Sequence, residues 1–164
     1  MIDAHDGKDS LADTPNIQAA VRVLDHRGSV TAYGTGQTQS LSYMTEFFEE
    51  SRVEDGPNWP PKEGEPILRP YEFLMTGGSF DGHGEFLWIV LVHESSELAK
   101  ENARILPERV RTAAGPFRAR NRAEFEIETI ETEGRLIIAT IRGMGVRALG
   151  YDFPDPMLLH EDPE

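Results

Sequence analysis

The eleven residues TGGSFDGHGEF, from Thr76 to Phe86, bring together several side chains that could do chemistry. They contain a serine, an aspartate, a histidine and a glutamate among four glycines. The stretch GGSFD narrowly misses the GxSxG nucleophile elbow, because Asp81 stands in place of the second glycine. The elbow also requires a helix after the serine, whereas the apolar residues that follow predict a strand. The sequence therefore predicts no catalytic serine in this stretch.

Asp81, His83 and Glu85 are metal ligands by residue type. In a hairpin that turns at Asp81 and Gly82, however, His83 and Glu85 project to one face while Asp81 belongs to the turn. The three side chains would converge only in an irregular loop. We therefore expect no metal site here, and we interpret the glycines as residues of a tight turn.

The segment GMGVRALG, residues 143–150, partly matches the glycine pattern of a dinucleotide-binding turn. That fold needs a helix, a further strand and an acidic residue after the glycines. Only residues 151–164 follow, which is too short a stretch for those elements. The sequence therefore predicts no cofactor.

The most ordered charge pattern is RARNRAEFEIE, residues 118–128. If this segment is extended, Arg118, Arg120 and Arg122 lie on one face together with the glutamates that follow. Such a face is usually solvated. Two functional alternatives are that the arginines bind an acidic partner or an anionic ligand, or that two copies of the 118–128 strand pair antiparallel so that arginines meet glutamates. The second alternative predicts a homodimer.

A proline-rich loop, residues 53–70, provides another candidate surface. Its five prolines remove backbone donors and disfavour helix in the residues before them. Trp59 within the loop and Tyr71 just after it are the aromatic residues that could stack on a small ligand held in an apolar pocket beneath the loop. The alternative is that Trp59 packs back on the domain and completes its core.

Composition limits the classes of partner. The 164 residues include 29 acidic and 16 basic side chains, which gives a net charge of −13. Because nucleic acids and anionic membranes are also negative, we expect no nucleic-acid partner. The chain has no cysteine, which excludes disulfides and thiolate ligands.

Residues 1–12 are polar and predict a flexible leader, and the longest apolar run, FLWIVLV, is too short to span a bilayer. We therefore expect no transmembrane segment. Two compartments fit the polar start: an extracytoplasmic location after removal of a signal or anchor, or the cytoplasm. Residues 13–160 are predicted to form a single domain, and residues 161–164 a flexible tail.

Several elements must position these residues. Pro15 and Gly28 bound a predicted helix, 33–40 is predicted to be a connector, and SLSYMTEFFEESR predicts a second helix. Residues 71–93 predict a hairpin with two apolar faces, with Tyr71 on the face of Phe73 and Gly77 making room for the indole of Trp88.

A strong helix is predicted to begin at Ser95 or Ser96, to be kinked or broken at Pro107 and to end at Gly115. His93 is expected to end the preceding strand beside the helix cap. A second hairpin turns near Glu133 and Gly134. Its shared face is expected to contain the following apolar residues: Phe125, Ile127, Leu136 and Ile138.

The fold class predicted from these elements is α+β. Its mainly antiparallel sheet consists of two hairpins flanking a helix, a ββαββ core, with one or two N-terminal helices and with helices packed on one side. The expected function is that of a noncatalytic domain acting through binding or assembly surfaces. Two alternatives are a small-ligand carrier and a small hydrolase or isomerase with a Glu or His as general base.

Overall fold

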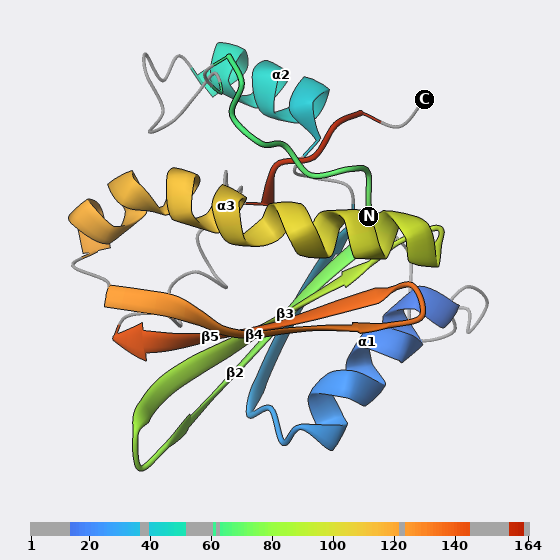
Figure 1. Cartoon of the computed structure of the whole chain (residues 1–164), viewed down its shortest axis with the longest axis vertical. Helices are drawn as coiled ribbons and strands as arrows, with labels where there is room; N and C mark the ends of the chain where they lie inside the picture. Colours follow the sequence, from blue (N-terminus) through green and yellow to red (C-terminus); the bar gives the residue numbers. More distant parts are fainter. Residues whose placement is uncertain are drawn as a thin grey trace.

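The computed structural model describes residues 14–36, 40–51, 61, 63–121, 124–144 and 158–162. This part of the chain contains three helices and five strands (Figure 1). In order they are α1 (Pro15–His26), β1 (Thr31–Gly36), α2 (Leu41–Ser51), β2 (Phe73–Asp81), β3 (Gly84–Val92), α3 (Ser96–Asn121), β4 (Glu124–Glu133) and β5 (Leu136–Met144). None of the described helices combines the length and the apolar character needed to cross a membrane.

The five strands form one sheet in the order β1-β2-β3-β5-β4, and every neighbouring pair is antiparallel. The predicted α+β class with a mainly antiparallel sheet is therefore confirmed. Part of β1 falls within residues 33–40, which are predicted above to form a connector because Gly34 and Gly36 precede a helix. Pairing with β2, from Thr31 opposite Gly78 to Gly36 opposite Phe73, makes this segment a strand.

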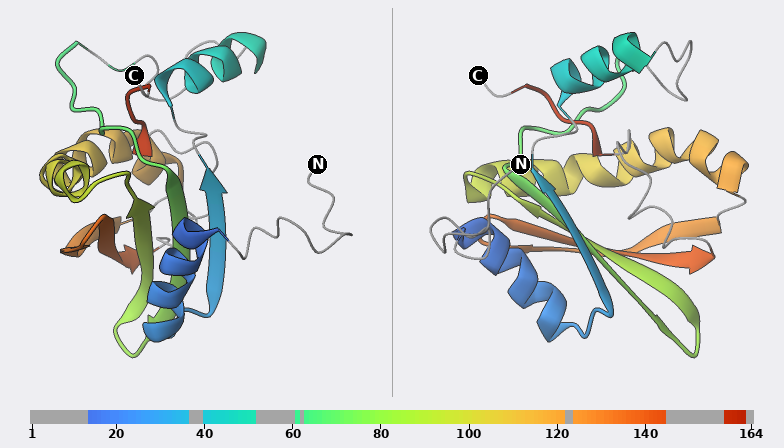
Figure 2. Two further views of the ribbon diagram at one scale, coloured as in Figure 1. Left: turned by 90° about the vertical axis from the view of Figure 1, so that its right-hand side faces the viewer. Right: turned by 180° about the vertical axis from the view of Figure 1, so that it is seen from behind.

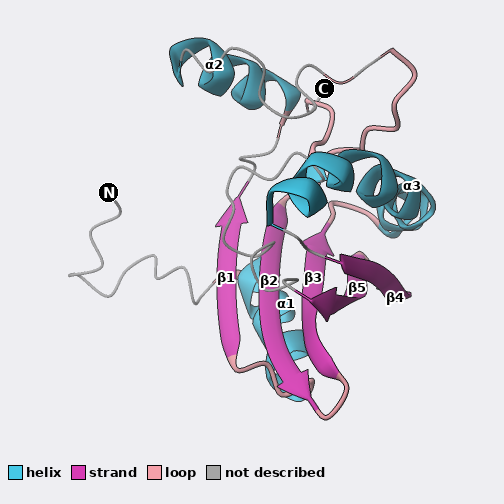
Figure 3. Cartoon of the chain, turned by 90° about the vertical axis from the view of Figure 1, so that its left-hand side faces the viewer, coloured by secondary structure: helices cyan, strands magenta, loops and turns pink. Residues whose placement is uncertain are grey.

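The helices cover both faces of the sheet, so the prediction that they pack on one side is wrong. One buried cluster joins Ala20 and Leu24 of α1 to Met75, Trp88 and Val90. The other joins α3 to the opposite face through a larger set of residues, which includes Leu74, Ile89, Leu91, Leu106, Val110, Ile137 and Ile141. Figures 1 and 3 show α1 and α3 on opposite sides of the sheet. The apolar character of both faces of β2 and β3 follows from this double cover.

The first hairpin turns one residue later than predicted. Asp81 pairs with Gly84, so the two loop residues are Gly82 and His83. Because the turn lies one residue later, each residue of β2 pairs with a β3 residue two positions further along the chain. Side chains alternate between faces at every residue, so a shift of two positions leaves them on their predicted faces. Tyr71 is an exception, because it precedes β2 and belongs to the cluster under α3 rather than to the face of Phe73.

Gly77 lies opposite Trp88, but its missing side chain makes room for a different neighbour than the one predicted. A Cβ atom built at Gly77 would lie 2.8 Å from Cδ2 of Leu24 and closer still to Oγ of Ser29. The absence of a side chain therefore allows α1 and the turn after it to approach the backbone of β2.

The second hairpin turns at Gly134 and Arg135, close to the predicted position, with Gly134 at a φ of 57°. A β-bulge lies between Ile127 and Thr129 and shifts the register by one residue. Phe125 and Ile127 consequently belong with the α3 cluster, whereas Leu136 and Ile138 belong with the α1 cluster. The prediction that these four residues share a face is wrong, because the extra residue reverses side-chain alternation on one side of the bulge.

The helix α3 is longer than predicted. The backbone N–H of Leu98 donates to Oγ of Ser95 across 3.2 Å, which confirms a serine cap. The helix then continues through Pro107 and Gly115 and ends at Asn121. The prediction that residues 118–128 form one strand is therefore wrong. Arg118 and Arg120 belong to α3, and β4 begins only at Glu124. Arginine and alanine after Gly115 are good helix formers, which favours this extension.

Candidate functional site

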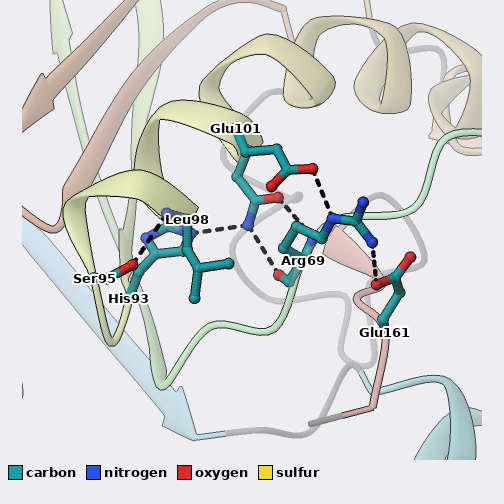
Figure 4. A network of polar contacts seen from close by, with 7 residues as sticks. Arg69, His93, Ser95, Leu98, Glu101 and Glu161 are labelled. Carbon is teal, nitrogen blue, oxygen red and sulfur yellow. Dashed lines mark hydrogen bonds and ion pairs between the residues drawn. The ribbon is translucent and has the colours of Figure 1, made fainter. Parts of the chain in front are cut away.

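A buried polar network lies where the end of β3, the start of α3 and the segment before β2 meet (Figure 4). Its fully buried polar residues are His93, which follows β3 directly, and Asn102 on the second turn of α3. Tyr71 and a second fully buried histidine, His160, extend the network toward the end of the chain. Polar side chains are rarely buried so completely unless they are hydrogen-bonded.

The backbone of Arg69 fixes the orientation of the Asn102 amide. The N–H of Arg69 donates to Oδ1 of Asn102 across 2.6 Å, and Nδ2 of Asn102 donates to the carbonyl oxygen of Arg69 across 2.9 Å. The same Nδ2 lies 2.9 Å from Nε2 of His93. Because an amide nitrogen only donates, Nε2 of His93 must accept.

His93 is therefore a neutral imidazole with its proton on Nδ1. That nitrogen lies 3.2 Å from the carbonyl oxygen of Arg135 and donates to it, which ties the end of β3 to the β4–β5 turn. Burial lowers the pKa of His93 below its usual value, although the Arg135 carbonyl and Glu72 act in the opposite direction. A proton on Nε2 would also place two donors face to face.

His160 is fully buried and packs its ring against Tyr71, with 4.4 Å between the ring centroids. Its Nδ1 lies 2.6 Å from the carbonyl oxygen of Glu161 and donates to it. Nε2 of His160 is buried and has no hydrogen-bond partner within the described part of the chain. Burial is the main cause that lowers the pKa of His160, and it prevails over the attraction of Asp162.

Residues 158–162, called the C-terminal segment below, bring His160 into the network. The backbone N–H of Leu68 donates to the carbonyl of Leu159 across 3.1 Å, and the N–H of Glu161 donates to the carbonyl of Leu68 across 2.8 Å. The hydroxyl of Tyr71 donates to the carbonyl of Leu158 across 2.9 Å. Glu161 and Asp162, both assigned above to the tail of residues 161–164, thus make specific contacts with the rest of the chain.

At the surface of the network, Arg69 joins the C-terminal segment to α3. Its guanidinium contacts Glu101 at 2.8 Å and Glu161 at 2.5 Å (Figure 4). These charge-assisted hydrogen bonds, with Glu101 first, raise the pKa of Arg69 further above its already high value. All three side chains are close to half exposed, so the contribution of these pairs to stability is small.

The stretch TGGSFDGHGEF forms no site of convergent ligands. Asp81 accepts the backbone N–H of His83 across 2.8 Å, and its carboxylate pairs with Arg142 of β5 at 3.1 Å. The N–H of His83 is the main cause that lowers the pKa of Asp81. His83 itself is exposed in the turn. Within the described residues, no group of three or more potential metal ligands lies close enough together to hold an ion.

The predicted binding residues are not brought together in the described structure. Tyr71 is buried in the core, with only 1% of its surface exposed. Arg118 and Arg120 lie on the last turns of α3, where the side chains are not described, and Trp59 and Arg122 lie outside the described residues. The structure therefore places one of the five in the network, as a core residue bonded to the C-terminal segment.

Sequence reasoning placed His93 at the end of its strand but missed the roles of Asn102 and His160. One signal was available for Asn102. Ala99, Asn102 and Leu106 follow the helical spacing of a buried seam, so Asn102 is a polar residue at a core position. His160 had no such signal, since its burial depends on contacts with residues about ninety positions earlier.

The two edges of the sheet differ sharply in character. The edge strand β4, EFEIETIETE, carries five glutamates and the bulge described above. The other edge strand, β1, has the sequence TAYGTG and carries no charge, proline or bulge (Figure 3). Charged side chains and bulges are the usual devices that prevent an edge from pairing with another strand. Only β4 has them.

No protein-family model, curated protein or solved structure matches this chain.

Proposed function

We propose that this protein is a noncatalytic assembly domain that self-associates through the outer edge of β1. Two copies place their β1 strands antiparallel about a twofold axis and extend the sheet across the dimer. The ββαββ unit from β2 to β5 serves as the rigid frame that presents this edge. The contrast between the two sheet edges is the observation that carries the proposal.

Edge strands leave a row of backbone N–H and C=O groups available for pairing, and antiparallel strand addition uses those groups for affinity. The five glutamates of β4 would repel a second β4, and its bulge interrupts a regular ladder. Nothing comparable protects β1 among the described residues. A strand without charged side chains pairs with its own copy at no cost in like-charge repulsion within the ladder.

The twofold arrangement also defines a register. Because opposed residues share a face of the sheet, a twofold axis places one residue of β1 opposite its own copy; with Tyr33 opposite Tyr33 of the partner subunit, Ala32 lies opposite Gly34 of the partner subunit. Ala32 and Gly34 are exposed in the single chain, so the strand is accessible to a partner. The partner that this edge accepts is therefore a second copy of the same chain.

The noncatalytic part of the proposal is supported by how the buried polar groups are used. Both nitrogens of His93 and both polar atoms of the Asn102 side chain hold segments of the fold together. A histidine with both nitrogens engaged in the core has no free position from which to transfer a proton to a substrate.

Sedimentation velocity at several protein and salt concentrations tests the proposal. With a net charge of −13 on each copy, long-range repulsion opposes association, and salt screens it. We therefore expect a dimer whose fraction increases with protein concentration and with salt. A dimer through arginine–glutamate pairs, as the 118–128 hypothesis requires, would weaken with salt instead.

A pair of variants locates the interface. Ala32→Glu adds a charge to the exposed edge of β1 and is expected to yield a monomer. Val21→Glu adds the same charge at a residue of α1 that is 46% exposed, and it is expected to dimerise like the wild type. A wild-type protein that stays monomeric at all concentrations and salt conditions, or an Ala32→Glu variant that dimerises normally, overturns the proposal.

A further inference from the structure

We infer that the C-terminal segment, residues 158–162, is an acid-released latch that joins α2 to the body of the domain, with the buried imidazole of His160 as its trigger. Above neutral pH the segment is docked between α2, α3 and the chain before β2. In acid, protonation of His160 releases the segment, and α2 separates from the body of the domain while the sheet stays folded. This inference does not depend on the dimer proposed above.

The latch is defined by what the C-terminal segment holds. On one side, the N–H of Leu41 at the start of α2 donates to the carbonyl of His160 across 3.0 Å. The N–H of Ser42 lies 3.2 Å from a carboxylate oxygen of Asp162, and the Ser42 hydroxyl donates to the same carboxylate. Ser40 and His160 also form a parallel bridge. The first turn of α2 is thus bound to the C-terminal segment by backbone and side chain.

On the other side, the same segment binds the body of the domain. Leu68 pairs with it on both of its backbone groups, and Tyr71 donates to the Leu158 carbonyl. Arg69 then joins Glu161 to Glu101 of α3. Figures 1 and 2 show the segment running between α2 and α3. Undocking it would remove contacts on both sides at once, which is what a latch requires.

His160 is the weak point of the latch in acid. Its Nδ1 already donates to the Glu161 carbonyl, and its buried Nε2 has no acceptor among the described residues. A second proton would therefore add a charge and an unsatisfied N–H donor to a fully buried ring. A buried group in this position is protonated most readily when it becomes exposed to water.

The charged and titratable neighbours do not remove this penalty. Asp162 favours the protonated imidazole, but its carboxylate is engaged with Ser42. Glu161 and Glu101 are paired with Arg69, whose own positive charge lies between them. Across Tyr71, His160 opposes the protonation of His93, whereas Glu72 favours it. Desolvation of the imidazole is the leading cause for both rings.

Amide hydrogen exchange at about pH 8 and about pH 5, corrected for the intrinsic pH dependence, tests the latch. In the wild type we expect residues 41–51 and 158–162 to lose protection several-fold in acid, because the protonated imidazole is tolerated only when the segment is undocked. Protection of β3 and β5 is expected to fall less than that of these two segments, because the sheet exchanges only through global unfolding. His160→Gln removes the titrating group, so the protection of both segments should no longer depend on pH. His83→Gln, in the exposed turn, is the matched control and should behave as the wild type.

The variant Tyr71→Phe tests the docking of the C-terminal segment without a change at His160. It removes the bond to the Leu158 carbonyl but keeps the ring, so residues 158–162 should exchange faster already at about pH 8 while the sheet remains protected. The inference is overturned if wild-type residues 41–51 and 158–162 keep their protection in acid. It is equally overturned if His160→Gln retains the wild-type pH dependence, or if the sheet loses as much protection as α2.

Discussion

Asn102 donates a hydrogen bond to Nε2 of His93 across 2.9 Å, and both side chains are fully buried. The amide is held in this orientation by two bonds to the backbone of Arg69, so the histidine is neutral in the folded protein. This single relationship connects the end of β3, the start of α3 and the chain entering β2. It also makes the fold sensitive to pH.

Replacing Asn102 with Asp should raise the pKa of His93. The substitution keeps the shape of the side chain but replaces the donor facing Nε2 with a carboxylate oxygen, which favours the protonated imidazole. It also removes the bond to the Arg69 carbonyl, so we expect a loss of about 1–3 kcal/mol near neutral pH, where the imidazole is least protonated. Imidazole resonances followed by NMR as a function of pH measure the first effect, and urea unfolding measures the second.

Asn102→Ala is the control for that prediction. It removes the same donor without adding a charge, so it should destabilise the protein while leaving the pKa of His93 lower than in Asn102→Asp. An unchanged pKa of His93 in Asn102→Asp would show that the amide is not the group facing Nε2.

The stability of the protein should fall as the pH drops below about 6.5. Burial lowers the pKa of His93 and of His160 below the usual histidine value of about 6.5. Because the unfolded chain then binds these protons before the folded chain does, stability decreases from the unfolded pKa downward until the folded pKa is reached. Above about 6.5 this contribution is constant, since neither state is protonated.

The double variant His93→Gln, His160→Gln isolates this contribution from that of the carboxylates. Its stability difference between about pH 8 and about pH 5 should be smaller than that of the wild type in chemical denaturation. His83→Gln should leave the wild-type difference unchanged because His83 is exposed. Equal pH dependence in the wild type and the double variant would contradict the assignment.

Gly77→Ala should destabilise the protein by about 1–3 kcal/mol, the usual cost of overpacking. The added methyl group would overlap Cδ2 of Leu24 and Oγ of Ser29. Gly82→Ala is the matched control, because nothing lies within 4 Å of a Cβ at that position. Thermal unfolding of the two variants side by side checks the prediction, which fails if they lose the same stability.

Leu24→Ala should cost about 2–5 kcal/mol, since Leu24 is buried in the cluster between α1 and the sheet. Val21→Ala on the exposed side of α1 should cost far less. In the Leu24→Ala background, Gly77→Ala should be less harmful than in the wild type, because the overlapping methyl groups are gone. A double-mutant cycle by denaturant unfolding measures this coupling, and strict additivity would argue against the contact.

Periodicity in the sequence was sufficient to predict the hairpins and the buried seam of α3. Ala99, Leu106 and Val110 recur at helical spacing and are buried, and the apolar alternation of β2 and β3 matches the two clusters. The same patterns gave the wrong face for Phe125 and Ile127, because a one-residue bulge is not visible as a change in composition. They also underestimated α3, since helix-breaking residues at 107 and 115 lie within a helix that continues to Asn121.

The sequence by itself determined the α+β class, the antiparallel character of the sheet and the turn near Gly134, because each depends on residues that are close together along the chain. Only the tertiary structure decided that β1 is an edge strand, that α1 and α3 cover opposite faces, and that His160 is buried beside Tyr71. These features depend on contacts between residues separated by tens of positions. Their energies arise from burial and hydrogen bonding across that distance, which local spacing does not encode.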